Sequence, residues 1–287
     1  MLYLIGLGLG DVEDIGVRGL RIARQAVRVY FEMYTAILDG PDNGIPALEK
    51  LLERSVIPAD RETLEEKADD ILDGADKDDV VVLVVGDPMA ATTHSDLILR
   101  AKTKNIPVKI IHNSSIISAV GATGLQVYRF GIVVSIVFWT ETWKPRSFAQ
   151  HISQNLQRGL HTLCLLDIRV KEPDMQALIR GRRVYEAPRF MTVAQAASQL
   201  LEIVRHPDPS TDTEPPVAFT ADTPCVGIAR LGLQTERMVA GRLRDLAEVD
   251  LGGPLHSLIV CGQLHPLEVE FLRTFALNDF LDSVPTG

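Results

Sequence analysis

The chain has 287 residues and a net charge of −9, and 46% of its residues are hydrophobic, which is the composition of a globular protein of about two domains. The negative charge argues against general nucleic-acid binding, because phosphate contacts need a positive surface. No apolar run approaches the roughly 20 residues of a membrane span, and the amino terminus lacks the basic lead of a secretory signal, so we expect a cytoplasmic protein without a membrane anchor.

The first part of the chain alternates short apolar runs with helical patterns. The predicted strands are 1–5, 27–31, 56–57, 80–85 and 107–111, and the predicted helices are 15–26, 46–53, 61–72 and 95–104. Strands that alternate with helices predict right-handed crossovers and a mostly parallel sheet. We therefore expect an α/β domain over residues 1–112, and ligands of such sheets bind beyond the carboxyl ends of the strands.

The pattern changes after residue 124, where fewer helices separate the strands. The predicted strands are 133–138, 161–167, 226–231, 238–243 and 257–261, and the predicted helices are 148–157, 193–204 and 266–275. This pattern predicts a second α/β domain with a mixed sheet over residues 113–278, followed by a tail at 279–287. The proline-rich segment 206–224 is expected to be a mobile surface loop.

The cysteines and histidines offer no sign of a disulfide or a metal site. Cys164, Cys225 and Cys261 are far apart in apolar stretches, which predicts buried thiols in a reducing compartment. The seven histidines show no spacing typical of metal ligands, so we expect no bound metal. The acid-rich stretch 60–79 is expected to be a solvated face, and so is the basic set Arg180, Arg182, Arg183 and Arg189.

The opening MLYLIGLGLGD ends a predicted strand in glycines, but it does not fit a dinucleotide-binding loop. The G-x-G-x-x-G fingerprint requires its third glycine at the position of Asp11, and Gly10 comes one residue too early. Glu32, at the end of the second strand, has the chemistry to bind a ribose hydroxyl. A strand-end residue that faces water is the favoured interpretation of Glu32.

Two further turns follow predicted strands of the same sheet. Asp87 lies in the Gly-Asp-Pro sequence after the strand 80–85, and a polar turn, 112–115, follows the strand 107–111. Each turn also has a purely structural interpretation: Gly-Asp-Pro is a common turn sequence, and Ser114 or Ser115 could simply cap the helix that follows. The three turns together, without a P-loop lysine, favour a small uncharged or cationic ligand over a polyphosphate.

Seven longer phrases carry a resemblance to a known family. They are MLYLIGLGLGD, VVGDPMAATTHSDLILRA, IHNSSIISAVGATGLQVYRFG, VSIVFWTETWKPRSF, HTLCLLDIRVKE, APRFMTVAQAASQLLEI and GGPLHSLIVCGQLHPLE. From residue 1 to about 275, apart from the proline-rich loop, the chain resembles the diphthine synthase family, most closely its eukaryotic members. These are tetrapyrrole-methylase-like, S-adenosylmethionine-dependent methyltransferases of diphthamide biosynthesis.

The resemblance implies two α/β domains with the cofactor S-adenosylmethionine in a cleft between them, in a homodimer. It implies that the substrate is elongation factor 2, whose target histidine carries a 3-amino-3-carboxypropyl group, and that four methyl groups are transferred. The cofactor contacts it implies are Leu9, Asp87, Ala90, Ser115, Ile116, Leu166, Leu231 and His256. No residue is assigned as a general base, and alignment of the reacting atoms is expected to supply most of the acceleration, an effect worth as much as ~7–11 kcal/mol.

Two other functions are compatible with the same fold. One is a methyltransferase for a small tetrapyrrole, which the phrases FWTETWKP and MTVAQAASQLLEI argue against. The other is a non-catalytic partner of the translation machinery. The three turns carry no disruptive substitution, which disfavours a loss of activity.

Overall fold

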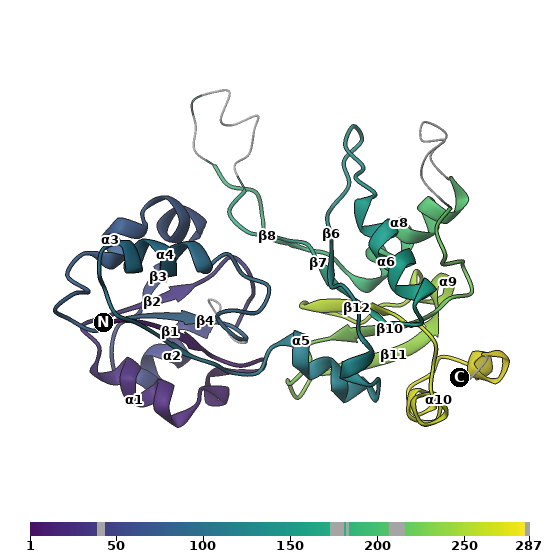
Figure 1. Cartoon of the computed structure of the whole chain (residues 1–287), viewed down its shortest axis with the longest axis horizontal. Coiled ribbons are helices and arrows are strands. Elements are labelled where there is room, and N and C mark those ends of the chain that lie inside the picture. The colour runs from purple at the N-terminus through teal and green to yellow at the C-terminus, as the bar shows by residue number, and fades with distance from the viewer. Residues whose placement is uncertain (39–43, 173–180, 182–183, 207–215, 285–287) are drawn as a thin grey trace. The chain divides into compact units, whose positions relative to one another are not determined.

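The structure is a computed structural model, and it describes residues 1–38, 44–172, 181, 184–206 and 216–284. The chain divides into two compact units, Met1–Ala119 and Val120–Gly287 (Figure 1). The division follows Ala119, a few residues beyond the expected boundary at 112. Within the described residues, no helix combines the length and the apolar character needed to cross a bilayer.

Unit 1 has a five-stranded sheet in the order β3-β2-β4-β1-β5. Its strands are β1 (Leu2–Gly6), β2 (Arg28–Glu32), β3 (Ile57–Ala59), β4 (Val80–Val84) and β5 (Val108–Ile111). Its helical segments are η1 (Val12–Asp14), α1 (Val17–Gln25), α2 (Ile45–Leu52), η3 (Glu62–Glu66), α3 (Ala68–Leu72), α4 (Ser95–Thr103) and α5 (Ile116–Ala119). Every pairing in this sheet is parallel, so the predicted parallel sheet is confirmed.

Strand β4 forms the centre of unit 1. All five of its residues are buried, which explains why its sequence is a continuous apolar run instead of an alternating one. Val81 and Leu83 pack with α1 and α2, whereas Val80 and Val82 pack on the opposite face with α3 and α4. Figure 1 shows the two helix pairs on opposite sides of the sheet. Burial of each Val or Leu side chain stabilises the fold by roughly 1.5–3 kcal/mol. Strand β4 therefore holds the helices against both faces of the sheet in a three-layer arrangement.

Unit 2 has a mixed five-stranded sheet in the order β11-β10-β12-β7-β6, in which only the β6–β7 pairing is parallel among the described strands. The strands of this sheet are β6 (Val134–Ile136), β7 (Thr162–Leu166), β10 (Pro224–Ala229), β11 (Arg237–Arg242) and β12 (His256–Val260). Two further strands, β8 (Ile168–Arg169) and β9 (Arg189–Phe190), pair antiparallel in a separate two-stranded sheet. The helical segments of unit 2 are η4 (Val120–Thr123), η5 (Val127–Arg129), α6 (Ser147–Gln157), α8 (Val193–Arg205), α9 (Leu243–Leu246), α10 (Pro266–Arg273) and η6 (Asp279–Ser283). The predicted antiparallel character of the five-stranded sheet is confirmed.

A single apolar core joins α6, α8 and α9 to one face of this sheet. Helix α8 begins where Thr192 and Gln195 form a capping box, in which each side chain accepts the other residue's backbone N–H. The predicted buried thiols are confirmed, because Cys164, Cys225 and Cys261 are all free and buried.

Several details of the predicted organisation differ. The predicted helix 61–72 is interrupted at Lys67, which separates a π-helical turn from α3. Of the predicted loop 206–224, residues 207–215 lie outside the described residues. In the part that follows, Phe219 is only 1% exposed and Pro224 begins β10, so the segment is anchored at these two points. The terminal segment, expected as a tail, forms η6 with Phe280 and Leu281 buried.

The basic set can be followed only in part, because Arg180, Arg182 and Arg183 lie outside the described residues. Arg189 forms ion pairs with Glu172 and Glu186, at 3.3 and 3.1 Å. Its guanidinium also lies 5.6 Å from the centre of the Phe138 ring. Its charge is therefore shared with acidic neighbours.

Candidate functional site

The opening glycines let two neighbouring turns close over the end of β1. A Cβ atom on Gly6 would lie 2.6 Å from the carbonyl oxygen of Gly86 and 2.8 Å from the Cβ of Asn113. Gly8 has a φ of +86° and exchanges backbone hydrogen bonds with Gly86, with N–O distances of 3.2 and 2.6 Å. The glycines are therefore needed for close backbone approach, since the turns after β4 and β5 meet above β1.

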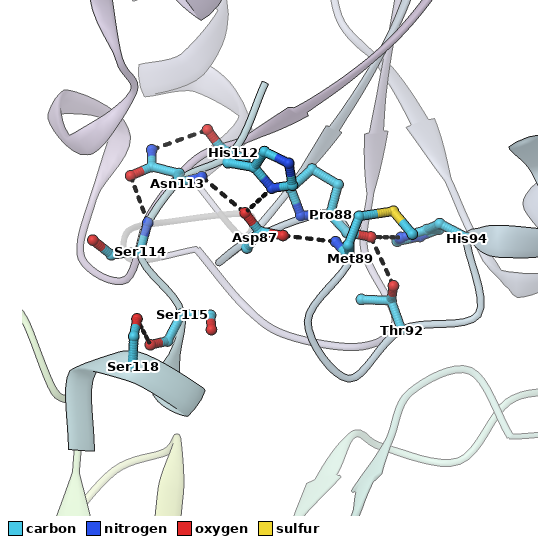
Figure 2. A network of polar contacts seen from close by, with 11 residues as sticks. Asp87, Pro88, Met89, Thr92, His94, His112, Asn113, Ser114, Ser115 and Ser118 are labelled. Atoms are coloured by element: carbon cyan, nitrogen blue, oxygen red, sulfur yellow. Dashed lines mark hydrogen bonds and ion pairs between the residues drawn. The ribbon is translucent and has the colours of Figure 1, made fainter. Parts of the chain in front are cut away.

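Asp87 is the centre of a polar network that links these turns (Figure 2). Its Oδ1 accepts the backbone N–H of Met89 at 2.8 Å, and its Oδ2 accepts the backbone N–H of Asn113 at 3.0 Å. Oδ2 also accepts Nδ1–H of His112 at 2.8 Å. Burial by itself would raise the pKa of Asp87, but the two backbone donors and His112 outweigh it, so the pKa is lowered and the carboxylate stays ionised.

Asn113 fastens the third turn to the first. Its side-chain amide donates to the carbonyl oxygens of Gly6, at 3.0 Å, and of Asp14, at 2.9 Å. Its Oδ1 accepts the backbone N–H of Ser114 at 2.8 Å. The sequence marks Asn113 only as part of a polar turn, because the partners of its side-chain amide are about a hundred residues away in the chain.

Leu9, Asp87, Ala90, Ser115 and Ile116 are the expected cofactor contacts in unit 1, and they all lie on the turns at the carboxyl edge of its sheet. Ser115 is buried beside Gly86, and its carbonyl oxygen accepts the N–H groups of Ser118 and Ala119 as α5 begins. Leu9, Ala90 and Ile116 are half-buried. The fold thus brings all five to one edge of the sheet.

The interpretation of Glu32 as a water-facing residue is wrong. Its side chain is 1% exposed, and its carboxylate accepts the backbone N–H groups of Tyr34 and Thr35, at 2.6 and 2.8 Å, and the Thr35 hydroxyl. Since Glu32 is occupied by its own turn, it is also not positioned as a ribose ligand. Its role is to hold the chain where β2 ends.

Leu166, Leu231 and His256 are the expected contacts in unit 2, and strand register brings them to one edge of that sheet. Leu165 is opposite Ser257, which places Leu166 beside His256 at the ends of their strands. His256 is also opposite Ala229, two residues before Leu231. Leu166, Leu231 and His256 are each less than a tenth exposed.

The ring of His256 is fully engaged within unit 2. Its Nδ1 accepts the backbone N–H of Val193 at 3.2 Å, and its Nε2 lies 2.9 Å from the carbonyl oxygen of Gly253. Since Nδ1 accepts, Nε2 carries the proton and the ring is neutral. Burial lowers the pKa of His256, in keeping with this neutral form. Any cofactor contact of His256 would thus use its backbone.

Arg230, which the sequence did not single out, organises the loops on either side of Leu231. Its guanidinium donates to the carbonyl oxygens of Thr235 and Leu251, both at 2.9 Å, and of Gly253. The surrounding loop geometry therefore depends on a cation that no local motif marks.

Comparisons with known proteins give the family. The profile of the tetrapyrrole (corrin/porphyrin) methylases matches residues 1–209. The diphthine methyl ester synthase of Bos taurus is 55% identical over 280 residues, which cover 97% of this chain and 96% of the relative. The Homo sapiens diphthine methyl ester synthase is 54% identical, with the same coverage. The chain belongs to the diphthine methyl ester synthase family.

A solved structure of a diphthine synthase supports this membership at the level of the fold. It has a TM-score of 0.76 and is 36% identical, covering 96% of this chain and 95% of that one. The predicted tetrapyrrole-methylase-type fold is thus confirmed, and so is the prediction of a methyltransferase enzyme. Family membership gives the chain a methyltransferase role in diphthamide biosynthesis, and it does not favour the alternative of a small-tetrapyrrole methyltransferase.

Proposed function

We propose that the chain transfers methyl groups from S-adenosylmethionine to the 3-amino-3-carboxypropyl group on a histidine of elongation factor 2. Three transfers go to the amine and one to the carboxylate, which gives diphthine methyl ester. The observation that carries the proposal is the 55% identity to a named diphthine methyl ester synthase over nearly the whole of both chains.

The residues of unit 1 fit the proposed methyl donor. Gly6 and Gly8 let the turns after β1, β4 and β5 pack closely together, which gathers the proposed contact residues at one edge of the sheet. Asp87 provides an ionised carboxylate whose charge suits a sulfonium cation, and three donors fill three of its roughly four acceptor positions. When bound, S-adenosylmethionine supplies a methyl group activated by a positively charged sulfur.

In this proposal Leu9, Asp87, Ala90, Ser115 and Ile116 hold the donor from unit 1. The edge of unit 2 that carries Leu166, Leu231 and the backbone of His256 is a second surface for it. The enzyme acts in the cytoplasm as a homodimer; three buried thiols suit a reducing compartment, and the homodimer rests on the family resemblance.

A methylation assay tests the proposal. Purified protein is incubated with radiolabelled S-adenosylmethionine and elongation factor 2 that carries the aminocarboxypropyl intermediate, and mass spectrometry counts the methyl groups. The expected result is label in the factor, with up to four additions. Elongation factor 2 without the aminocarboxypropyl group is the matched control and stays unlabelled.

Other outcomes would replace the proposal. Label in an added porphyrinogen, with none in the factor, would favour a tetrapyrrole substrate. Calorimetric binding of S-adenosylmethionine without transfer to either acceptor would favour a non-catalytic partner of the translation machinery.

A further inference from the structure

His112 and Asp87 form a hydrogen-bonded pair across the end of β1. His112 follows β5 and Asp87 follows β4, and β1 lies between those strands in the sheet. The His112 Nδ1 is 2.8 Å from Asp87 Oδ2, and the two side chains differ in exposure, at 67% for His112 and 12% for Asp87. A sheltered carboxylate thus orients an imidazole that is open to solvent (Figure 2).

The pairing determines which ring nitrogen is available. Oδ2 of the ionised Asp87 can only accept, so the proton lies on Nδ1 of His112. In the neutral ring Nε2 then carries a free electron pair. The carboxylate is itself fixed by the backbone N–H groups of Met89 and Asn113, so the direction of the ring is fixed by the backbone.

The proposed reaction has an unmet need for a base. An alkylammonium group has a reference pKa between about 8 and about 10.4, so at pH 7 only about one amine in ten to one in a few thousand has a free electron pair. The carboxylate of the same substrate is ionised at that pH and needs no deprotonation. The amine steps and the ester step therefore place different demands on the protein.

We propose that Nε2 of His112 is the general base for the amine methylations and that Asp87 is its positioning residue. The proposal rests on the proposed function above. It identifies a catalytic residue for that reaction among side chains that the family resemblance does not assign.

The proton and electron balance is complete for each amine step. The substrate nitrogen gives one proton to Nε2, and the resulting imidazolium is stabilised by the charge of Asp87. The nitrogen's electron pair forms a bond to the methyl carbon while the carbon–sulfur bond breaks and leaves its pair on sulfur. Because His112 is exposed, the imidazolium returns its proton to solvent before the next transfer.

The other titratable groups around this turn do not compete for the role. Asp14 accepts the backbone N–H of Gly10 through its carboxylate at 2.8 Å. His94 is 2% exposed, and its Nδ1 lies 3.1 Å from the carbonyl oxygen of Pro88. His94 is buried, whereas Asp11, Glu13 and Asp14 are exposed but carry carboxylates, which are far weaker bases than an imidazole.

The remaining histidines are all in the described residues, and none is on a strand-end turn of unit 1. Two of them, His161 and His256, use both ring nitrogens for contacts inside unit 2. His265 caps α10, while His151 and His206 lie on and just after helices. Position alone therefore separates His112 from the rest.

The test compares two steps in one enzyme. His112→Gln keeps a polar side chain but removes the base, and single-turnover rates are measured on the aminocarboxypropyl substrate and on its trimethylated product. At pH 7 the first amine transfer should slow at least about a hundredfold more than the ester transfer, the lower end of the range of about 10²–10⁴ that general bases provide. The variant's amine rate should then rise about five- to tenfold between pH 7 and pH 8, as solvent deprotonates the substrate.

Two controls accompany this comparison. His151→Gln changes another exposed histidine, on α6, and should leave the ratio of the two rates unchanged. Nuclear magnetic resonance of the protein without S-adenosylmethionine should find the His112 proton on Nδ1, and Asp87→Asn should shift it towards Nε2.

Three results would overturn the proposal while leaving the proposed function intact. They are unchanged amine rates in His112→Gln, equal slowing of both steps with weaker S-adenosylmethionine binding, and a resting proton on Nε2 of His112 in the wild type. Failure of the wild-type protein to label elongation factor 2 would instead refute the proposed function itself.

Discussion

Gly6→Ala adds one methyl group at the point where the turns after β4 and β5 meet. The new Cβ would lie 2.6 Å from the Gly86 carbonyl oxygen, 2.8 Å from the Asn113 Cβ and 3.1 Å from the Pro88 Cδ. The first two distances are shorter than real Cβ contacts, and the Gly86 oxygen belongs to the backbone, so no side-chain rotation relieves the clash. The turns must therefore separate.

The expected cost follows from the number of hard contacts. Overpacking in a well-packed region costs about 1–3 kcal/mol, and two severe contacts, one of them with backbone, place this variant near the upper end. We expect the free energy of unfolding to fall by about 3 kcal/mol, measured by urea denaturation. Calorimetry should also find weaker binding of S-adenosylmethionine, because the same turns carry its proposed contacts.

Gly16→Ala is the matched control. Gly16 has an ordinary negative φ of −63°, and an added Cβ there would meet no atom within 4 Å. Its cost should stay below about 1 kcal/mol, since it affects only the N-cap of α1. Equal stabilities of the two variants would refute the argument that Gly6 is required for close approach.

Three other predictions concern buried polar groups. Asp87→Ala should lower the free energy of unfolding by about 2–4 kcal/mol in denaturation experiments, because three donors lose their charged acceptor; a change below about 0.5 kcal/mol would contradict this. Glu32→Ala should cost about 3 kcal/mol in the same assay, whereas a water-facing residue would cost almost nothing. Burial lowers the pKa of both His161 and His256 from 6.5, so the unfolded chain binds more protons and stability should fall as the pH drops below about 6.5. A urea midpoint that stays constant from pH 7 to pH 5 would rule out this linkage.

The local pattern of the sequence determined the elements and the three turns. The apolar run of β4 and the helical spacing of α1, α4 and α8 each depend on residues a few positions apart, so they can be read without knowledge of the fold. The one-residue mismatch at Gly10 likewise excluded a dinucleotide loop from the sequence alone. The sequence pattern did not predict the helix interruption at Lys67 or the burial of Phe219. Both depend on packing against residues that are distant in the chain.

Only the tertiary structure decided what those turns do. The sequence places Asp87 and His112 after predicted strands, but it does not reveal that β1 lies between β4 and β5. That strand order sets Nδ1 of His112 2.8 Å from Oδ2 of Asp87. The sequence also does not reveal that Gly6 is small because two turns meet over it, or that Glu32 is buried. These facts depend on strand order and on contacts between residues far apart in the chain. The periodicity of a single segment carries no information about such contacts.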